Sequence, residues 1–180
     1  MQHPFMWLSV PYQWALLVIL CAGTAGFAMM LTAQGKPLRT SAAPHGILAY
    51  EFAWNRDRAA QILGSWSSLK DTAQQQLLLD FGFLILYPIL LSLACAMLAE
   101  SPLNSMAIVG CFVSWVMLAA GPLDAVENFA LLRMLDVGAS EGLARLAGWC
   151  AGVKFLLVYS GLGYIALQGL GVLIEKICAV

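Results

Sequence analysis

Between Val113 and Leu135 the chain reads VSWVMLAAGPLDAVENFALLRML. The segment begins as an apolar helix and is interrupted at Gly121-Pro122. After the interruption, Asp124, Glu127 and Asn128 stand in an otherwise apolar run. Acidic side chains at the edge of a hydrocarbon phase are costly, so they usually have partners or a function. The segment therefore predicts a membrane helix that carries a polar site.

Composition places the whole chain in the same class. Of its 180 residues, 61% are hydrophobic and only 11% are charged, whereas a soluble domain carries about a quarter charged residues. The hydrophobic residues are gathered in long blocks, which indicates a membrane protein. The formal net charge is −1, so we expect no nucleic-acid partner.

The apolar blocks predict an all-α membrane protein, in which four transmembrane helices form one bundle. We expect a single membrane domain over residues 1–180. The expected spans are 12–33, 68–99, 102–136 with a kink at 121–122, and 141–175. Residues 1–11 contain no Lys or Arg, so we expect no signal peptide and a retained first span.

The long connection over residues 34–67 contains one further predicted helix. Apolar residues recur at helical spacing from Ile47 to Trp66, with Asn55, Arg58 and Gln61 among them. This pattern is typical of an amphipathic helix that lies on the membrane surface or on the bundle. We therefore expect such a helix between the first two spans.

Basic residues set the expected orientation, because they concentrate in two connections. These residues are Lys36, Arg39, Arg56, Arg58 and Lys70 in the first connection, and Arg133 and Arg145 between the third and fourth spans. The positive-inside rule puts both connections, and with them the amphipathic helix, in the cytoplasm. Both chain termini are then expected on the opposite side of the membrane, which in a bacterial inner membrane is the periplasmic side.

That orientation brings polar side chains from separate segments to one membrane depth. The candidate ligand-binding residues are Glu51, Arg58, Asp80, Tyr87, Asp124, Glu127, Asn128 and Lys154. Asp124 and Asn128 are four residues apart and share a helix face. Lys154 lies in an apolar helix, so we expect it to have an acidic partner among Asp80, Asp124 and Glu127.

Two interpretations of this cluster stay open at the level of sequence. It is either a salt-bridge network that orients helices, or a polar pocket beneath the amphipathic helix. The pocket would bind a lipid-like or small amphipathic ligand, with membrane lipid as the other partner. The network would suit an accessory subunit of a membrane complex, or a homo-oligomer. The excess of acids over one embedded lysine favours the pocket.

The sequence gives little support to an enzymatic function. The sequence contains no phosphate-binding glycine loop and no H-E-x-x-H. Its two histidines, His3 and His45, cannot supply a three-His zinc site, and its five cysteines form no C-x-x-C. We therefore expect no catalytic residue, metal or cofactor. An ion-coupled transporter or a membrane enzyme that uses Asp124 and Glu127 is the remaining alternative.

Four blocks of the sequence resemble those of a known group. They are GILAYEFAW (46–54), LLLDFGFLILY (77–87), LDAVENFALLRML (123–135) and VKFLLVY (153–159). They are similar to the G-I-x-x-[FY]-E-x-A, D-x-x-E-N and K-F blocks of small, uncharacterised bacterial four-helix integral membrane proteins. The resemblance covers about residues 46–164. It implies a bacterial inner-membrane protein and supplies no activity.

We predict that the chain segments around Arg56 and Arg133 are inaccessible from the periplasm, because the positive-inside rule keeps basic connections in the cytoplasm. Trypsin added to intact spheroplasts should cleave neither segment, and it should cleave both after the membrane is permeabilised. Cleavage at either site in intact spheroplasts would contradict the predicted orientation.

Overall fold

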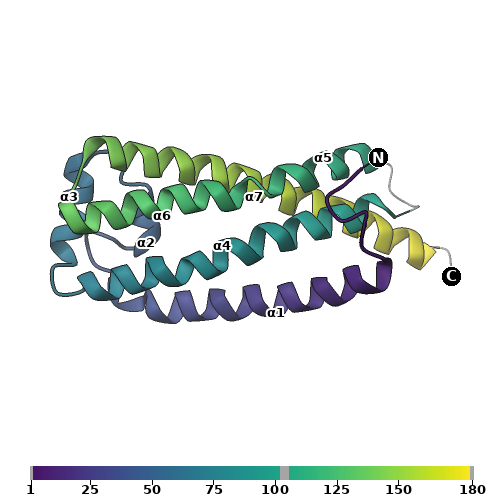
Figure 1. Cartoon of the computed structure of the whole chain (residues 1–180), viewed down its shortest axis with the longest axis horizontal. Coiled ribbons are helices and arrows are strands. Elements are labelled where there is room, and N and C mark those ends of the chain that lie inside the picture. The colour runs from purple at the N-terminus through teal and green to yellow at the C-terminus, as the bar shows by residue number, and fades with distance from the viewer. Residues whose placement is uncertain (1, 102–105, 179–180) are drawn as a thin grey trace. The chain divides into compact units, whose positions relative to one another are not determined.

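The computed structural model describes residues 2–101 and 106–178, and of residues 172–178 only the backbone. Within this part of the chain every regular element is helical (Figure 1). The elements are α1 (Val10–Gln34), the short 3-10 helix η1 (Lys36–Leu38), α2 (Ile47–Glu51), α3 (Arg56–Ser65), α4 (Lys70–Ala99), α5 (Ala107–Met117), α6 (Ala120–Val137) and α7 (Glu141–Cys178). The expected start of the third span at residue 102 lies outside the described residues.

Four stretches are long and apolar enough to cross a membrane. They are Val10–Gln34, Lys70–Ala99, Ala107–Val137 and Glu141–Gly171. At 1.5 Å per residue even the shortest of them would extend about 38 Å, which exceeds a hydrocarbon core of about 30 Å. The expected all-α class with four apolar helices is therefore confirmed, and it is compatible with an integral membrane protein.

The third span is interrupted earlier than its sequence predicts. The expected kink lay at 121–122, whereas α5 ends at Met117 and α6 begins at Ala120. Pro122 therefore falls in the first turn of α6. A proline is tolerated there because the first N–H groups of a helix have no partner within the helix. The break consequently precedes the proline instead of coinciding with it.

The single helix expected from Ile47 to Trp66 is wrong, because the structure divides it into α2 and α3. Trp54 lies between them with a φ of 61°, a left-handed conformation in which a right-handed helix cannot continue. Asn55 then starts α3, since its side chain accepts a hydrogen bond from the Arg58 N–H at 2.9 Å. Asparagine is among the most favourable residues for this capping position.

The chain forms two compact units, and each has a hydrophobic core of its own. The first unit comprises Met1–Thr24, Leu86–Ala120 and Phe155–Val180, and the second comprises Ala25–Ile85 and Gly121–Lys154. The first core contains Phe5, Leu20, Leu93 and Ala96. The second core is larger and gathers residues of η1, α2, α3, α4, α6 and α7.

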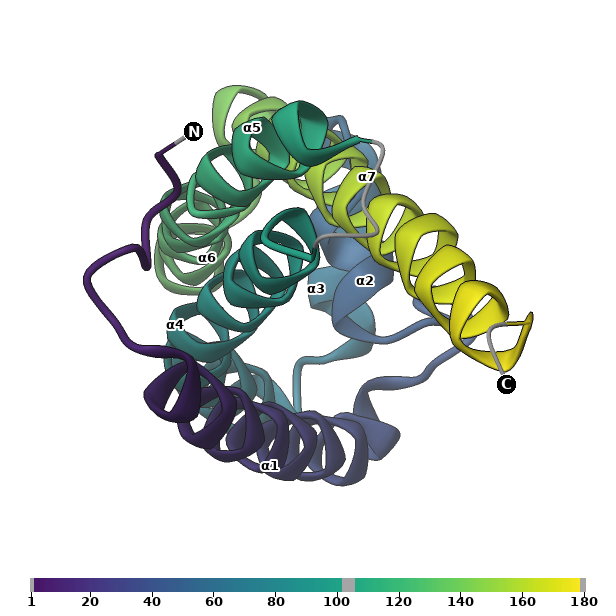
Figure 2. The same cartoon turned by 90° about the vertical axis from the view of Figure 1, so that its right-hand side faces the viewer.

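In the first unit, α4 and α5 lie side by side (Figure 2). The Ser92 hydroxyl, on α4, donates a hydrogen bond to the Ser114 carbonyl oxygen of α5 at 2.6 Å. Gly110 on α5 faces the Tyr164 hydroxyl so closely that a β-carbon would collide with it. Small and hydroxyl-bearing residues allow helices to approach closely in lipid.

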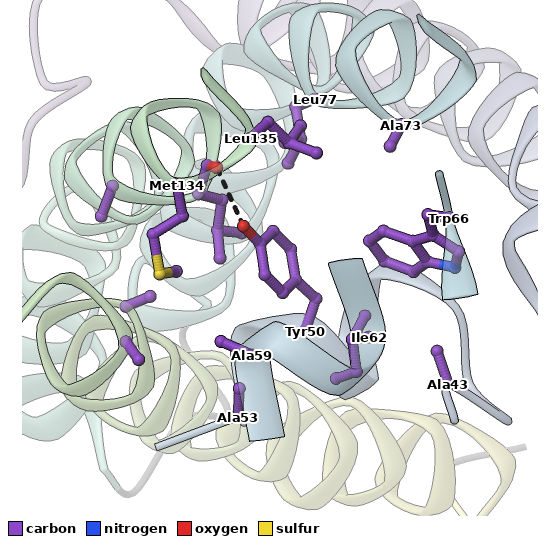
Figure 3. Close-up of a cluster of buried hydrophobic side chains, with 14 of the residues drawn as sticks. Ala43, Tyr50, Ala53, Ala59, Ile62, Trp66, Ala73, Leu77, Met134 and Leu135 are labelled. Carbon is purple, nitrogen blue, oxygen red and sulfur yellow. Dashed lines mark hydrogen bonds between the residues drawn. The ribbon is translucent and has the colours of Figure 1, made fainter. Parts of the chain in front are cut away.

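The core of the second unit is built around Tyr50 and Trp66, which are 0% and 1% exposed (Figure 3). Their rings meet edge to face, with centroids 5.4 Å apart. The Tyr50 hydroxyl donates to the Leu131 carbonyl oxygen at 3.2 Å, and the Trp66 indole N–H donates to the Leu38 carbonyl oxygen at 2.8 Å. These bonds attach α2 to α6, and the end of α3 to η1.

We predict that Tyr50→Phe lowers the free energy of unfolding by about 1 kcal/mol, because it removes one buried hydrogen bond. Tyr50→Ala should cost about 3–5 kcal/mol, because it also leaves a cavity. Thermal and denaturant unfolding in mild detergent would measure both changes. Tyr12, which is 68% exposed, supplies matched controls; Tyr50 variants no less stable than the Tyr12 variants would contradict the packing described above.

Candidate functional site

Lys154, on α7, lies at the centre of a buried group of acidic side chains. It is 6% exposed, and its Nζ lies 2.8 Å from Asp124 Oδ1 and 2.9 Å from Glu127 Oε2. Glu51 Oε2 lies at 3.8 Å from the same Nζ. We call Glu51, Asp124, Glu127 and Lys154 the acidic cluster. All four belong to the second unit.

Local sequence explains how the acids reach the lysine. Asp124 and Glu127 are three residues apart on α6, which puts them on one side of the helix. Glu51 is the last residue of α2, directly after the buried Tyr50 that attaches α2 to α6. Three separate elements therefore supply the cluster, and the expected pairing of Lys154 with Asp124 and Glu127 is observed.

Asp80 and Asn128 form a second polar contact in the same unit. The Asn128 amide donates to Asp80 Oδ2 at 2.6 Å, and Asn128 is 1% exposed. Asn128 follows Asp124 by four residues, so both lie on one face of α6. Asp80, which was one of three expected partners of Lys154, is thus held by a neutral amide beside the cluster.

Two of the expected site residues have other surroundings. Arg58 is half-buried, and its polar contacts within the described chain are local, to Asn55 and Gln61. Tyr87 belongs to the first unit, where its hydroxyl donates to the Ala120 carbonyl oxygen at 3.4 Å. The structure therefore does not bring Arg58 to the acids.

The acidic cluster contains more negative than positive charge. Three carboxylates and one ammonium give a formal charge of −2 when all four groups are ionised. Glu127 is 0% exposed, and its Oε1 has no hydrogen-bond partner among the described residues, as is true of Glu51 Oε2. Such buried charge is costly unless a proton or a further cation compensates it. The cluster is therefore suited to hold one or the other.

Glu51 is the member of the cluster that lies outside the four apolar spans. Burial raises the pKa of its carboxyl above the ordinary value, while the Lys154 ammonium opposes that rise. A raised pKa means that the folded protein binds this proton more tightly than the unfolded chain does. Protons and cations should therefore compete at Glu51.

A divalent metal ion fits the site less well. Among the side chains of residues 2–101 and 106–171, no group of three or more His, Cys, Asp or Glu residues is arranged to hold a metal ion. The nearest approach is the acidic cluster, where two carboxylate oxygens lie within 3 Å of the Lys154 ammonium. That arrangement matches recognition of an organic ammonium better than coordination of a metal.

One short motif resembles a catalytic motif, and its structural surroundings decide how it is interpreted. Residues Gly138–Gly142 read G-A-S-E-G, which fits the G-x-S-x-G pattern of serine hydrolases. In those enzymes the serine lies on a sharp turn from a strand to a helix. Ser140 instead lies between α6 and α7, and its carbonyl oxygen accepts the first helical hydrogen bond from the Ala144 N–H at 2.9 Å. We interpret the motif as the start of α7.

Sequence reasoning missed a partly buried hydrogen bond between His3 and Glu100 in the first unit. His3 is 4% exposed, and its Nε2 lies 2.7 Å from Glu100 Oε1. Its Nδ1 accepts a hydrogen bond from the Phe5 N–H at 3.2 Å, which leaves Nε2 as the nitrogen that donates to Glu100. The two residues are 97 positions apart, and neither lies in an apolar block. No periodic pattern in the sequence therefore predicts their contact.

Comparison with known proteins adds no relative. No protein-family model matches the sequence, and no curated protein or solved structure shows a significant match to the chain.

We predict that Lys154→Met destabilises the protein by about 3–5 kcal/mol, because it leaves buried carboxylates without their counter-ion. Adding Asp124→Asn or Glu127→Gln should recover part of the loss, with a coupling energy of about 0.5–3 kcal/mol. Double-mutant cycles on unfolding in detergent would measure this coupling. Asp80→Asn is the matched control, and we expect weaker coupling for it. If all three cycles are additive, Lys154 merely extends its ammonium toward the lipid head groups.

Proposed function

We propose that this protein is an integral protein of the bacterial inner membrane that binds a small amphipathic or lipid-like ligand through the acidic cluster, without catalysis. The four apolar helices support the membrane location. The resemblance of the four sequence blocks and the two basic connections support the bacterial membrane and the orientation. Binding is favoured over catalysis because no catalytic motif has its structural context in the described chain.

The excess negative charge of the acidic cluster carries this proposal. A ligand with an ammonium or guanidinium group would supply the missing positive charge. Its N–H groups could donate charge-assisted hydrogen bonds to Glu127 Oε1 and Glu51 Oε2, which accept no hydrogen bond from the described residues, although Glu51 Oε2 lies 3.8 Å from the Lys154 ammonium. An apolar tail on the ligand would remain in hydrocarbon. A cationic amphiphile therefore fits both the charge and the surroundings of the site.

The location of Glu51 suggests how the ligand would be covered. Glu51 ends α2, and the following residues Phe52–Asn55 lead into α3. This segment contributes the Glu51 carboxylate to the cluster. Its position should therefore change when a proton or a cationic ligand neutralises that carboxylate. We propose that the α2–α3 segment covers the bound ligand on the cytoplasmic side.

A structural role is the alternative, and one observation favours it. The contacts of Lys154 at 2.8 and 2.9 Å already join α7 to α6 without any ligand. A proton held on one acid would then complete the charge balance. In that case the protein would be an accessory subunit of a membrane complex, or a homo-oligomer, and the cluster would only orient helices.

We predict that dodecylammonium raises the thermal midpoint of the purified protein in neutral detergent, and that dodecanoate does not. Glu127→Gln should abolish the effect, because it removes one ligand-facing charge with little change in volume. Asp136→Asn is the matched control: it makes the same kind of change on α6, but at a side chain that is 59% exposed. Equal responses to the two amphiphiles, or an undiminished response in Glu127→Gln, would support the structural alternative.

The pH dependence follows from the raised pKa of the Glu51 carboxyl. Below that pKa a proton occupies the carboxyl and opposes cation binding. Affinity for dodecylammonium should therefore increase as pH rises from the ordinary glutamate range through the raised pKa, while the amine stays charged up to about pH 10. Glu51→Gln should flatten this part of the profile, and an affinity that falls over this range would contradict the assignment.

Native mass spectrometry would test the same question without an added probe. An amphiphile retained by the wild-type protein and lost from Glu127→Gln would support ligand binding. A protein that co-purifies in fixed proportion, with no small molecule, would support the accessory role.

A further inference from the structure

A strained tryptophan marks a second surface on the second unit. Trp54 connects α2 to α3 with a φ of 61°. This conformation is costly for a bulky side chain, and strained residues persist only where their surroundings hold them. The contacts that hold Trp54 therefore show what the strain maintains.

Besides the Phe52 ring, whose centroid lies 6.3 Å away, those contacts come from α7. The Trp54 ring lies over Gly148, where an added β-carbon would be only 2.8 Å from ring atoms of the indole. It also meets Trp149 edge to face, with centroids 5.5 Å apart. Despite this packing, Trp54 is 39% exposed and Trp149 is 66% exposed. The contacts that hold Trp54 thus leave a pair of partly exposed indoles on the surface.

Two arginines are close to the indoles in the sequence, and one acid, Glu141, contacts both. Glu141 Oε2 accepts the Arg56 N–H at 2.8 Å, and its Oε1 lies 2.7 Å from Arg145 Nη2. One carboxylate therefore holds the start of α3 next to Arg145 on α7. The Arg56 side chain is exposed, as is Arg145, so both guanidinium groups can reach an external ligand.

The order of these residues along α7 resembles that of residues at a membrane surface. Glu141, Arg145 and Trp149 follow at intervals of four, which puts them on one face. Each interval advances about 6 Å along the helix. The charged residues come first, and the indole lies one turn further toward the apolar part of the span. Interfacial tryptophans occupy the head-group level in this way.

We propose that Trp54, Arg56, Arg145 and Trp149, which we call the Trp–Arg patch, bind the phosphate head group of an anionic phospholipid. Guanidinium groups bind phosphate oxygens in pairs, which favours arginine in such sites. The indoles would lie against the upper part of the acyl chains. Around the patch three arginines, Arg56, Arg58 and Arg145, outnumber the two acids Asp57 and Glu141, so it should prefer an anionic head group over a zwitterionic one.

The test adds phosphatidylglycerol or phosphatidylcholine to the full-length protein in neutral detergent, and counts bound lipid by native mass spectrometry. The wild type should retain phosphatidylglycerol preferentially. Arg56→Gln with Arg145→Gln should weaken that binding by about 30-fold, since one basic residue near an anionic surface is worth about fivefold. Arg39→Gln with Arg133→Gln makes the same change of charge at two other exposed arginines, and it should leave the preference intact.

A pair of glycine variants tests the indoles without changing any charge. Gly148→Ala should displace Trp54 and weaken retention of phosphatidylglycerol, whereas Gly152→Ala, which has no neighbouring atom within 4 Å, should not. Both variants replace a helical glycine by alanine, which favours the helix, so loss of folding is not the expected cause.

Three results would overturn the proposal. The wild type could bind both lipids equally, or the Arg56→Gln, Arg145→Gln protein could keep its preference. Alternatively, inorganic phosphate at the same concentration as the lipid could displace phosphatidylglycerol completely, which would show a site for a free anion. Equal lipid retention by the two glycine variants would show that the indoles do not belong to the site.

Discussion

The ammonium group of Lys154 determines how the charged residues of the second unit can be arranged. It contacts carboxylates from α2 and α6 while projecting from α7, so a single positive charge sets the relation of three elements. Each of these acids would be costly to bury alone. The positions of α2 and α6 next to α7 are therefore conditional on one side chain. The same shortage of positive charge is the basis for the proposed cationic ligand.

Much of this arrangement could be predicted from the sequence, because its causes are local. Span length follows from runs of apolar residues, and these runs do not depend on distant contacts. The spacing of Asp124 and Glu127 puts them on one helix face, and the placement of the basic connections then brings Lys154 to the same depth. Glu51 could also be included, because the connection that contains it lies at the same expected membrane level.

The features that could not be predicted depend on tertiary contacts. Helical periodicity runs through Ile47 to Trp66 without interruption, and nothing in that pattern marks Trp54 as left-handed. Its conformation depends on Gly148, which is 94 positions further along the chain. The expected membrane depth of its helix groups Arg58 with the acids, but depth does not show that the Arg58 side chain makes its polar contact locally, with Gln61. The interruption before Pro122 likewise reflects how a helix start tolerates proline.

The chain order of the acidic cluster has a consequence for membrane assembly. Glu51, Asp124 and Glu127 are all synthesised before Lys154, since α7 follows α2 and α6. Until α7 has been synthesised, the chain contains these three acids without the ammonium group that contacts them in the folded unit. The contacts through which Lys154 joins α2 and α6 to α7 can therefore form only after α7 has been added. A chain that ends before α7 contains the acids and lacks their counter-ion.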